Sequence, residues 1–313
     1  MKILIGYDGS EGAGYALKDL AAAGMPAKAQ AMIVTVIPPM LPMAASAPQS
    51  FGAQGYPGTY VEVVVRNRLK SESKLSAKAY SASRELKRSF PGWKMDVDCI
   101  IGSPAEEILN RADEYKPDMI VMGSRGWSLT GRLLIGSVAE KVLTHSRSNI
   151  RICKGKPKQT GPPRLLIGFD GSKESKLAVE VVADRNWPEG TLVQLTAVSD
   201  FRNRMDQLTR ALGAGKTPAP EAKSSWPWME DNLAKAKERL AQREILAEAA
   251  ILSGDPRTVL LAQAKKFRAD TLFLGSRGIS GVKRFLLGSV SAYVSSRSPC
   301  SMEIIRMRGG QTS

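Results

Sequence analysis

The chain contains one stretch of sequence twice. "GSRGWSLTGRLLIGSVAEKVL" begins at Gly123, and "GSRGISGVKRFLLGSVSAYV" begins at Gly275, 152 positions later. Upstream, "ILIGYDGSEGA" from Ile3 returns as "LLIGFDGSKES" from Leu165, 162 positions later, so the second copy is ten residues shorter between these anchors. Two full-length copies indicate a tandem duplication. A chain of 313 residues is long enough to bury the two cores that such a duplication requires.

Each copy predicts alternating strands and helices. Short apolar runs predict strands, and segments with apolar residues on one face predict helices. In the first copy the predicted strands are 2–7, 31–37, 94–101, 118–123 and 149–154, and the predicted helices follow Ser10 and residue 59 and span 103–115 and 137–146. Strands separated by helices of ten or more residues pair in parallel, which predicts a layered α/β sheet in each copy.

Local signals refine this prediction. Ser10 and Ser103 are expected to cap helices. The long helix after residue 59 is expected to turn inward the residues Val61, Val64, Val65 and Leu69. The segment "KGKPKQTGPP" has no apolar residues except its prolines and predicts a linker. The expected division is therefore a first domain at 1–153, a linker at 154–163 and a second domain at 164–308.

Composition excludes several classes of protein. The chain has 45 Lys and Arg against 30 Asp and Glu, a net charge of +15, but these residues are dispersed among acidic and small ones. No zinc finger, RNA-binding aromatic signature or basic tail accompanies them, so we expect a solvated basic surface and no nucleic-acid partner. No uncharged apolar run approaches the ~20 residues that cross a bilayer, which predicts no membrane association.

The cysteines and the N-terminus favour a cytoplasmic protein. Cys99, Cys153 and Cys300 are scattered and form no C-x-x-C pair, which argues against a zinc site and a disulfide framework. We expect three buried structural thiols in a reducing compartment. The chain runs from Met1 directly into a predicted strand, so no signal peptide is expected.

The glycines of the repeat predict an anion site. Both copies carry the pattern G-x2-G-x9-G-S, at Gly123, Gly126, Gly136 and Ser137 and at Gly275, Gly278, Gly288 and Ser289. The first glycine ends a predicted parallel strand, where open α/β sheets bind ligands, and the last precedes a predicted helix, whose free N–H groups attract phosphate. Cations stand nearby in both copies, at Arg125 and Arg277 and at Arg132 and Arg284.

The alternative is that these glycines only shape strand-to-helix turns and that each serine is an ordinary helix cap. The pattern is neither a Walker P-loop, because no Gly-Lys-Ser/Thr occurs, nor the G-x-G-x-x-G of Rossmann dinucleotide sites.

With these motifs in view, the sequence resembles the universal stress protein family in its tandem, ATP-binding form. The resemblance covers both halves and rests on "IGYDGS" and "IGFDGS", "VTVI" and "LTAV", and the glycine pattern with "VMGSRG" and "FLGSRG". It implies two tandem open five-stranded parallel-sheet domains, Rossmann-like and similar to adenine nucleotide alpha hydrolases, with helices on both faces. It also implies ATP, ADP or AMP across the carboxyl ends of the strands.

The resemblance assigns roles to individual residues. Asp8 and Asp170 would meet the ribose hydroxyls or a Mg²⁺ ion bound to the phosphates; the alternative for Asp8 is a helix cap. Val36 would hold the adenine edge through its backbone, and Ala197 is taken as its counterpart. The remaining implied site residues line the pocket or surround the phosphates: Met122, Gly123, Arg125, Gly126, Gly136, Ser137 and Val138, with Leu274, Gly275, Arg277, Gly278, Gly288, Ser289 and Val290.

The predicted fifth strands depart from the family pattern. The first copy ends "SRSNIRICK" where the family has a Cys-Pro-apolar strand, and the second ends "SPCSMEIIR" with Glu303 inside the strand. Single-domain members of the family commonly pair through these strands, which implies an intramolecular pseudo-dimer here and leaves a further homodimer open. Arg151 and Glu303 occupy equivalent positions, and opposite charges favour cross-strand pairing. We therefore expect "IRIC" to pair antiparallel with "MEII"; the alternative is two unrelated surface charges.

Three functions remain open: a nucleotide-binding regulator of the stress response, a slow ATPase, and a nucleotide-independent interaction scaffold. The only histidine, His145, is replaced by Arg297 in the second copy, which makes it a poor catalytic candidate. We expect binding without efficient turnover, with ATP in both copies. The charge-free connection 38–59 is long for an α/β unit, so it is either a lid or contact surface, or an insertion without a role.

Overall fold

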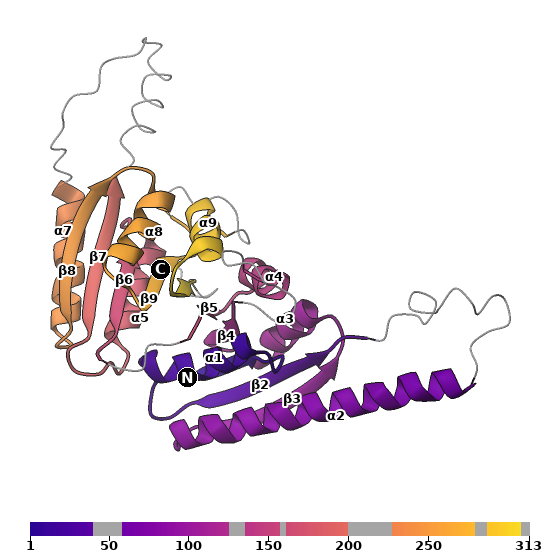
Figure 1. Cartoon of the computed structure of the whole chain (residues 1–313). Coiled ribbons are helices and arrows are strands. Elements are labelled where there is room, and N and C mark those ends of the chain that lie inside the picture. The colour runs from indigo at the N-terminus through magenta and orange to yellow at the C-terminus, as the bar shows by residue number, and fades with distance from the viewer. Residues whose placement is uncertain (40–57, 125–134, 157–160, 200–226, 279–286, 308–313) are drawn as a thin grey trace, which may run out of the picture.

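The computed structural model describes residues 1–39, 58–124, 135–156, 161–199, 227–278 and 287–307, apart from the side chains of 58–65, 67 and 68. Figure 1 shows these residues in two halves that lie side by side, the first coloured from indigo to magenta and the second ending in yellow. Each half alternates strands with helices, as the repeat predicts.

The elements follow one another in the same order in both halves. The first half contains β1 Lys2–Gly6, α1 Glu11–Asp19, the short 3-10 helix η1 Leu20–Ala22, β2 Gln30–Ile37, α2 Gly58–Ser89, β3 Lys94–Ile101, α3 Pro104–Tyr115, β4 Met119–Gly123, α4 Ser137–His145 and β5 Asn149–Cys153. The second half contains β6 Arg164–Gly168, α5 Lys173–Ala183, β7 Leu192–Ser199, α7 Pro227–Ala241, β8 Leu246–Ser253, α8 Pro256–Lys266, β9 Thr271–Gly275, α9 Ser289–Arg297 and β10 Ser301–Ile305. The strands and helices predicted in the first copy agree with these bounds to within one residue.

The ten strands form one sheet, in the order β3-β2-β1-β4-β5-β10-β9-β6-β7-β8. Within each half, neighbouring strands run parallel. Among the described strands the single antiparallel pairing joins β5 to β10. The predicted α/β class, with a five-stranded parallel sheet in each copy, is confirmed, and the two sheets are fused at their fifth strands.

Alternate strand residues face opposite sides of the sheet and build different cores. On one face, Leu4 packs with α3 and α4 into a core that continues across the junction, through Ile152 of β5 and Met302 of β10, to α8 and α9. On the other face the apolar residues form two separate clusters: Ile3 lies with α1 and α2 in the first half, and Ile167 lies with α5 and α7 in the second. The two halves therefore share a core on one face of the sheet only.

Charged side chains fill the gap between these two separate clusters. Arg151 and Glu303 stand opposite each other in the β5–β10 register, both fully buried, with Nη1 and Oε2 3.2 Å apart. Arg151 Nε also donates to Asp19 Oδ2 at 2.6 Å, and its Nη2 donates to Thr271 Oγ1 at 3.0 Å. Arg185 pairs with both carboxylate oxygens of Glu303. Two acidic and two basic groups balance in this buried network.

The network explains how four charges are tolerated inside the protein. Burial by itself lowers the pKa of the Arg151 guanidinium, but the negative charges of Asp19 and Glu303 more than reverse this and raise its pKa. The predicted strand pairing and the contact between Arg151 and Glu303 are confirmed. The alternative of two unrelated surface charges is wrong, because both side chains are fully buried.

Helix α2 departs from its predicted packing. Leu69 is 60% exposed, whereas the residues that pack against the sheet are Ala79, Ala82 and Leu86, about three to five turns later. Figure 1 shows why, because the N-terminal part of α2 projects beyond the sheet. The side chains of the other predicted inward residues, Val61, Val64 and Val65, and residues 40–57 of the connection lie outside the described part of the chain.

The two predicted caps differ from each other. Ser10 caps α1, with its side-chain oxygen accepting from Ala13 N at 3.2 Å. Ser103 occupies the N-cap position of α3, but its side chain makes no capping hydrogen bond. In the second half the equivalent Asp255 does cap, accepting from Arg257 N at 2.9 Å. The predicted position of Ser103 at the start of α3 is confirmed, but the predicted capping by its side chain is wrong.

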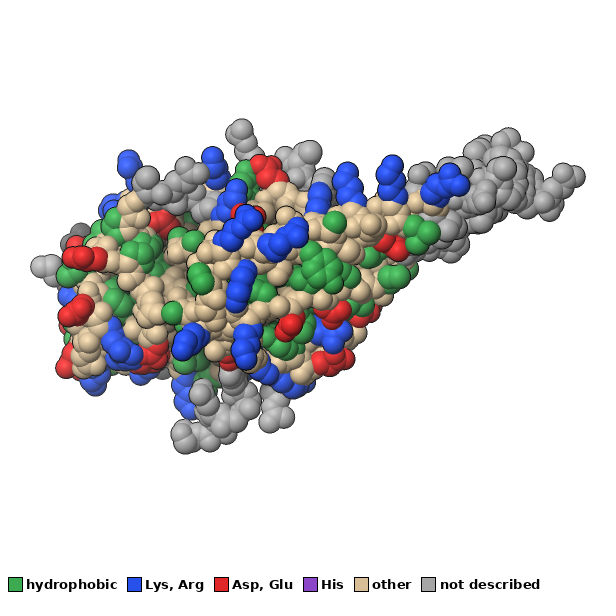
Figure 2. All heavy atoms as spheres, turned by 90° about the horizontal axis from the view of Figure 1, so that it is seen from below, with side chains coloured by type: hydrophobic (Ala, Val, Ile, Leu, Met, Phe, Trp, Pro, Cys, Tyr) green, Lys and Arg blue, Asp and Glu red, His purple; other side chains and the backbone are tan. Residues whose placement is uncertain are grey.

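The surface carries its positive charge in dispersed form. Figure 2 shows Lys and Arg side chains spread over one face of the molecule and interleaved with acidic and apolar ones. None of the helices in the described part of the chain combines the length and apolarity needed to span a membrane.

One of the three predicted buried thiols is exposed. Cys99 lies on the edge strand β3 and is open to solvent, whereas Cys153 and Cys300 are buried. Burial raises the pKa of the Cys300 thiol to about 11, and burial together with the nearby Asp19 carboxylate raises the pKa of Cys153 well above its ordinary value. The thiolate is the reactive form, so both buried thiols are doubly protected.

We predict that iodoacetamide at pH 8 modifies only Cys99 in the folded protein. Cys153 and Cys300 are shielded, and their raised pKa values keep them protonated at this pH. Mass spectrometry of the tryptic peptides checks this, with labelling in denaturant as the control that all three thiols are free. Rapid labelling of Cys153 in the folded chain would contradict the buried arrangement.

We predict that Glu303→Ala destabilises the chain by about 3–5 kcal/mol, because it leaves two buried guanidinium groups without their shared partner. Denaturant unfolding measures the loss. A double-mutant cycle with Arg151→Ala is expected to show a coupling of at least ~0.5 kcal/mol between the two side chains. The control is Lys235→Ala, which breaks an exposed ion pair with Asp231. If this variant lost as much unfolding free energy as Glu303→Ala, burial would not be the cause and the prediction would be contradicted.

Candidate functional site

A cavity of ≈ 310 Å³ opens in the first half, where the strands β1, β2 and β4 end. This is within the range of about 300–1,000 Å³ for small-molecule sites, and the carboxyl ends of parallel strands are where open α/β sheets bind ligands. Its walls come from β1, β2 and β4, from the loops that follow them, and from α1, α2, α3 and α4. The lining residues are Gly6, Tyr7, Asp8, Ala13, Val34, Val36, Pro38, Leu75, Pro104, Ile108, Met122, Gly123, Ser124, Gly136, Ser137, Val138 and Ala139.

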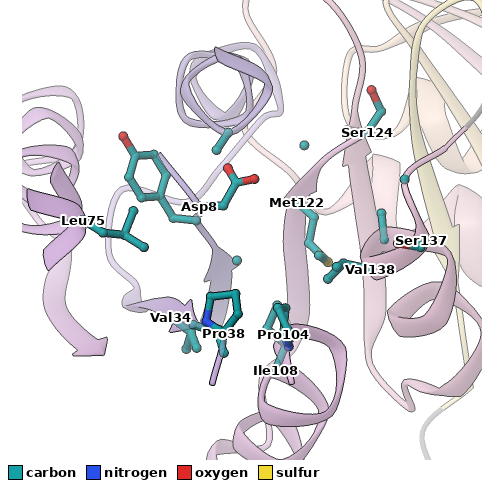
Figure 3. Close-up of a pocket in the computed structure, with 17 residues that line it drawn as sticks. Asp8, Val34, Pro38, Leu75, Pro104, Ile108, Met122, Ser124, Ser137 and Val138 are labelled. Carbon is teal, nitrogen blue, oxygen red and sulfur yellow. The ribbon is translucent and has the colours of Figure 1, made fainter. Parts of the chain in front are cut away.

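The cavity has an apolar end. In the close-up, Val34 and Pro38 from the end of β2 lie beside Pro104 and Ile108 from the start of α3 (Figure 3). Gly6 leaves room beside them, since a Cβ there would stand 3.2 Å from Ile108 Cδ1. A flat apolar group fits this end without burying an unpaired polar atom.

The opposite end presents hydrogen-bond donors. Helix α4 begins at Ser137, with Gly136 as its N-cap and no side chain capping it. The N–H groups of Ser137, Val138 and Ala139 therefore have no acceptor within the helix, and all three residues line the cavity. The N–H of Gly136 is already bonded to Ser124 O at 2.8 Å, which closes the turn. A helix start of this kind attracts anions.

The helix start corrects the alternative interpretation of the serines. If Ser137 and Ser289 were ordinary caps, each would occupy the N-cap position of its helix. Instead the caps are Gly136 and Gly288, and the serines are the first helical residues. The hydroxyl of Ser137 is consequently exposed at the cavity.

Asp8 lies between the two ends of the cavity. Figure 3 shows its carboxylate facing the side that carries Met122 and Ser124. The cap of α1 is Ser10, not Asp8, and one oxygen of Asp8 accepts from Ser10 N at 2.9 Å. Asp170 accepts from Ser172 N at 3.0 Å in the same way. The alternative role of Asp8 as the helix cap is therefore wrong.

Most of the residues predicted for the first site are brought together. Asp8, Val36, Met122, Gly123, Gly136, Ser137 and Val138 all line the cavity. Arg125 and Gly126, like Arg132 and Arg284, lie outside the described residues. Val34, two residues before Val36 on the same side of β2, was not predicted, and no pattern in the sequence signals Leu75 or Ile108, which come from helices.

The strand register corrects the counterpart of Val36. Gly6 pairs with Val34 in the first half and Gly168 pairs with Thr196 in the second, so Val36 corresponds to Val198. Ala197 lies one residue earlier and packs on the opposite face of the sheet, with Ile167. Ala197 is therefore not the counterpart of Val36.

The second half repeats the framework of the first with different side chains. Gly288 caps α9, Ser289 and Val290 follow it, and Leu274 and Gly275 end β9. Gly168 is crowded, because a Cβ there would lie 2.3 Å from Leu274 Cδ2. Thr196 replaces Val34, and its buried hydroxyl finds no hydrogen-bond partner in the described structure.

The single histidine of the chain lies away from this cavity. His145 ends α4, at the opposite end from the cavity, with Nδ1 2.8 Å from Lys141 O. Within the described ranges no three His, Cys, Asp or Glu side chains cluster as metal ligands would. Asp8 lines the cavity and offers a carboxylate oxygen to a divalent ion that a bound molecule brings with it.

We predict that Gly123→Ala lowers the free energy of unfolding by about 1–3 kcal/mol, because the new Cβ would stand 2.7 Å from the backbone carbonyl of Gly12. Gly6→Ala is the matched control at another strand end. Its Cβ would meet only the side chains of Ile108 and Met122, at 3.2 and 3.3 Å, which can shift. Denaturant unfolding compares the two variants. If Gly6→Ala lost as much unfolding free energy as Gly123→Ala, or more, the contact of Gly123 with the backbone of α1 would not explain the effect.

Comparison with known proteins agrees with this architecture. The model of the universal stress protein family matches residues 1–154 and 163–306. Universal stress protein YxiE of Bacillus subtilis is 42% identical over 74 residues, which are 24% of this chain and 50% of that protein. A universal stress protein of Mycolicibacterium smegmatis is 27% identical over 192 residues, 61% of this chain and 62% of its own length. The chain thus spans between half and two thirds of the length of these two relatives.

The fold comparison covers the whole chain. The solved structure of a universal stress protein from Archaeoglobus fulgidus is 24% identical, and 98% of each chain superposes with a TM-score of 0.61. This similarity shows the fold. Since the family model matches both halves, the chain belongs to the universal stress protein family.

Proposed function

We propose that the first half binds an adenine nucleotide, ATP in particular, in the cavity at the ends of β1, β2 and β4. The observation that carries the proposal is the combination of an apolar end, an uncapped helix start and a carboxylate within one cavity. The apolar end suits the adenine ring, and the helix start suits the phosphates. The carboxylate can accept hydrogen bonds from the ribose hydroxyls.

Each part of the nucleotide has a partner in this proposal. The adenine lies between the end of β2, with Val36, and the side chain of Met122. The phosphates take the N–H groups at the start of α4, beside Gly136 and Ser137. Asp8 meets the ribose or, when Mg²⁺ accompanies the phosphates, provides an oxygen ligand to it. The role of Mg²⁺ in this proposal is to neutralise phosphate charge.

We propose binding without efficient turnover, so that nucleotide occupancy acts as a signal in the stress response. The position of His145 away from the cavity supports this, because a general base must reach the attacking water. The two other candidates are a slow ATPase and a nucleotide-independent scaffold. Neither has a described feature that favours it over binding.

We further propose that the chain is an intramolecular pseudo-dimer of two units, residues 1–153 and 164–308, joined by the linker 154–163. The antiparallel pairing of β5 with β10 and the buried contact between Arg151 and Glu303 support this. A pairing made within one chain leaves the fifth strand of each half unavailable to a second molecule.

We predict that the purified protein, denatured and examined by mass spectrometry, releases ATP. ADP as the main species would favour the slow ATPase, and no nucleotide after purification without dialysis would favour the scaffold.

We predict that Gly136→Val weakens ATP binding about 10–100-fold, because the branched side chain crowds the helix start and displaces charge-assisted hydrogen bonds. Isothermal titration measures the affinity. Gly288→Val, at the equivalent cap of α9, is the matched control and should leave the first site intact. Unchanged affinity and stoichiometry in Gly136→Val would contradict the site.

A further inference from the structure

The two halves differ at one position beside the glycine loop. Helices α1 and α5 approach the ends of β4 and β9 in the same way. A Cβ on Gly123 would lie 2.7 Å from the backbone of Gly12, and a Cβ on Gly275 would lie 2.7 Å from Cβ of Glu174. Glu174 therefore stands in the second half where Gly12 stands in the first, in the first turn of its helix. The first half has no side chain at this point.

The carboxylate of Glu174 is turned into the structure and is held there. Its side chain is 9% exposed, and Oε1 lies 2.8 Å from Nη2 and 3.0 Å from Nε of Arg277. Arg277 belongs to the glycine loop itself, between Gly275 and Gly278. Two N–H groups of one guanidinium on one carboxylate oxygen make a strong, directional contact.

Glu174 engages a cation that would otherwise attract a phosphate. Its partner Arg277 is one of the cations of the glycine loop, which also contains Arg284. Its position in the first turn of α5 stabilises its negative charge at the positive end of that helix. A second carboxylate is also close, since a Cβ on Gly278 would stand 2.6 Å from Oδ2 of Asp170. Asp170 has the counterpart Asp8 in the first half, so Glu174 is the acidic side chain of this group that distinguishes the two halves.

Arg277 has a second cation near it. Arg306 follows β10, and burial together with the charge of Arg277 lowers the pKa of Arg306 to about 10. Glu174 gives Arg277 a negative partner in this positively charged environment.

We propose that Glu174, by holding Arg277 of the glycine loop, keeps a triphosphate out of the second half, so that each chain binds one ATP, in the first half only. This rests on the proposed function. A triphosphate entering the second site would compete with Glu174 for Arg277 and would face a buried like charge. The expectation of ATP in both copies is replaced by two inequivalent sites, which a single residue distinguishes.

Isothermal titration with Mg-ATP tests the proposal on the full chain. The wild-type protein is expected to bind one ATP, and Glu174→Gly, which restores the residue of the first half, is expected to bind two. Glu174→Gln keeps the size and removes the charge, so it should strengthen binding at the second site by at least ~10-fold if charge is the cause. The double variant Glu174→Gly with Gly136→Val should bind one ATP, which assigns the new site to the second half.

The reciprocal change gives an independent reading. Gly12→Glu should remove the wild-type site, because it gives the first half, beside Gly123, the carboxylate that the second half carries at the equivalent position. Circular dichroism melting of every variant shows that it is folded. Two ATP per wild-type chain, or a single one in both Glu174→Gly and Glu174→Gln, would overturn this inference and leave the proposed function standing. No binding to any of these proteins would overturn the proposed function.

Discussion

The antiparallel contact between β5 and β10 is the constraint on which the whole molecule depends. Because the chain is a duplication, β5 and β10 are equivalent strands. Their antiparallel pairing places residues of equivalent position opposite each other. If both strands carried Arg at this position, two guanidinium groups would meet in a dry interior, at a desolvation cost of several kcal/mol for each. With Glu303 at the second position, and with Asp19 and Arg185 completing the balance, the same geometry becomes an attraction. Joining the halves therefore required them to diverge.

The polarity of this junction also separates the two ligand sites. Strands within each half are parallel, and the halves meet antiparallel, so the carboxyl ends of the two five-stranded sheets point to opposite edges of the ten-stranded sheet. Neither site can share a ligand with the other. A substitution in one site therefore has no direct contact with the other, and Gly12 and Glu174 are one such difference. The shared core on one face of the sheet joins the two halves.

Much of the site could be predicted because backbone geometry determined it. Gly136 and Ser137 follow a strand and begin a helix, and free N–H groups at a helix start are a property of any helix. Strand order then brings Asp8, Val36 and Gly123 to one edge. Leu75 and Ile108 could not be predicted in this way, because each comes from a helix whose rotation about its own axis depends on packing. The one-residue error at Ala197 has a similar origin: only pairing with β6 shows which side of the sheet a residue of β7 faces.

The sequence by itself determined that this chain is a duplication of an α/β unit, where its strands and helices lie, and which glycines surround the candidate site. These follow from periodicity and spacing, which are local properties. Only the tertiary structure decided that Cys99 and Leu69 are exposed, that the four charges at the junction are buried, and that Glu174 reaches Arg277 across about a hundred residues of chain. Exposure and partnership are set by what the rest of the chain places alongside a residue, and no local pattern contains that information.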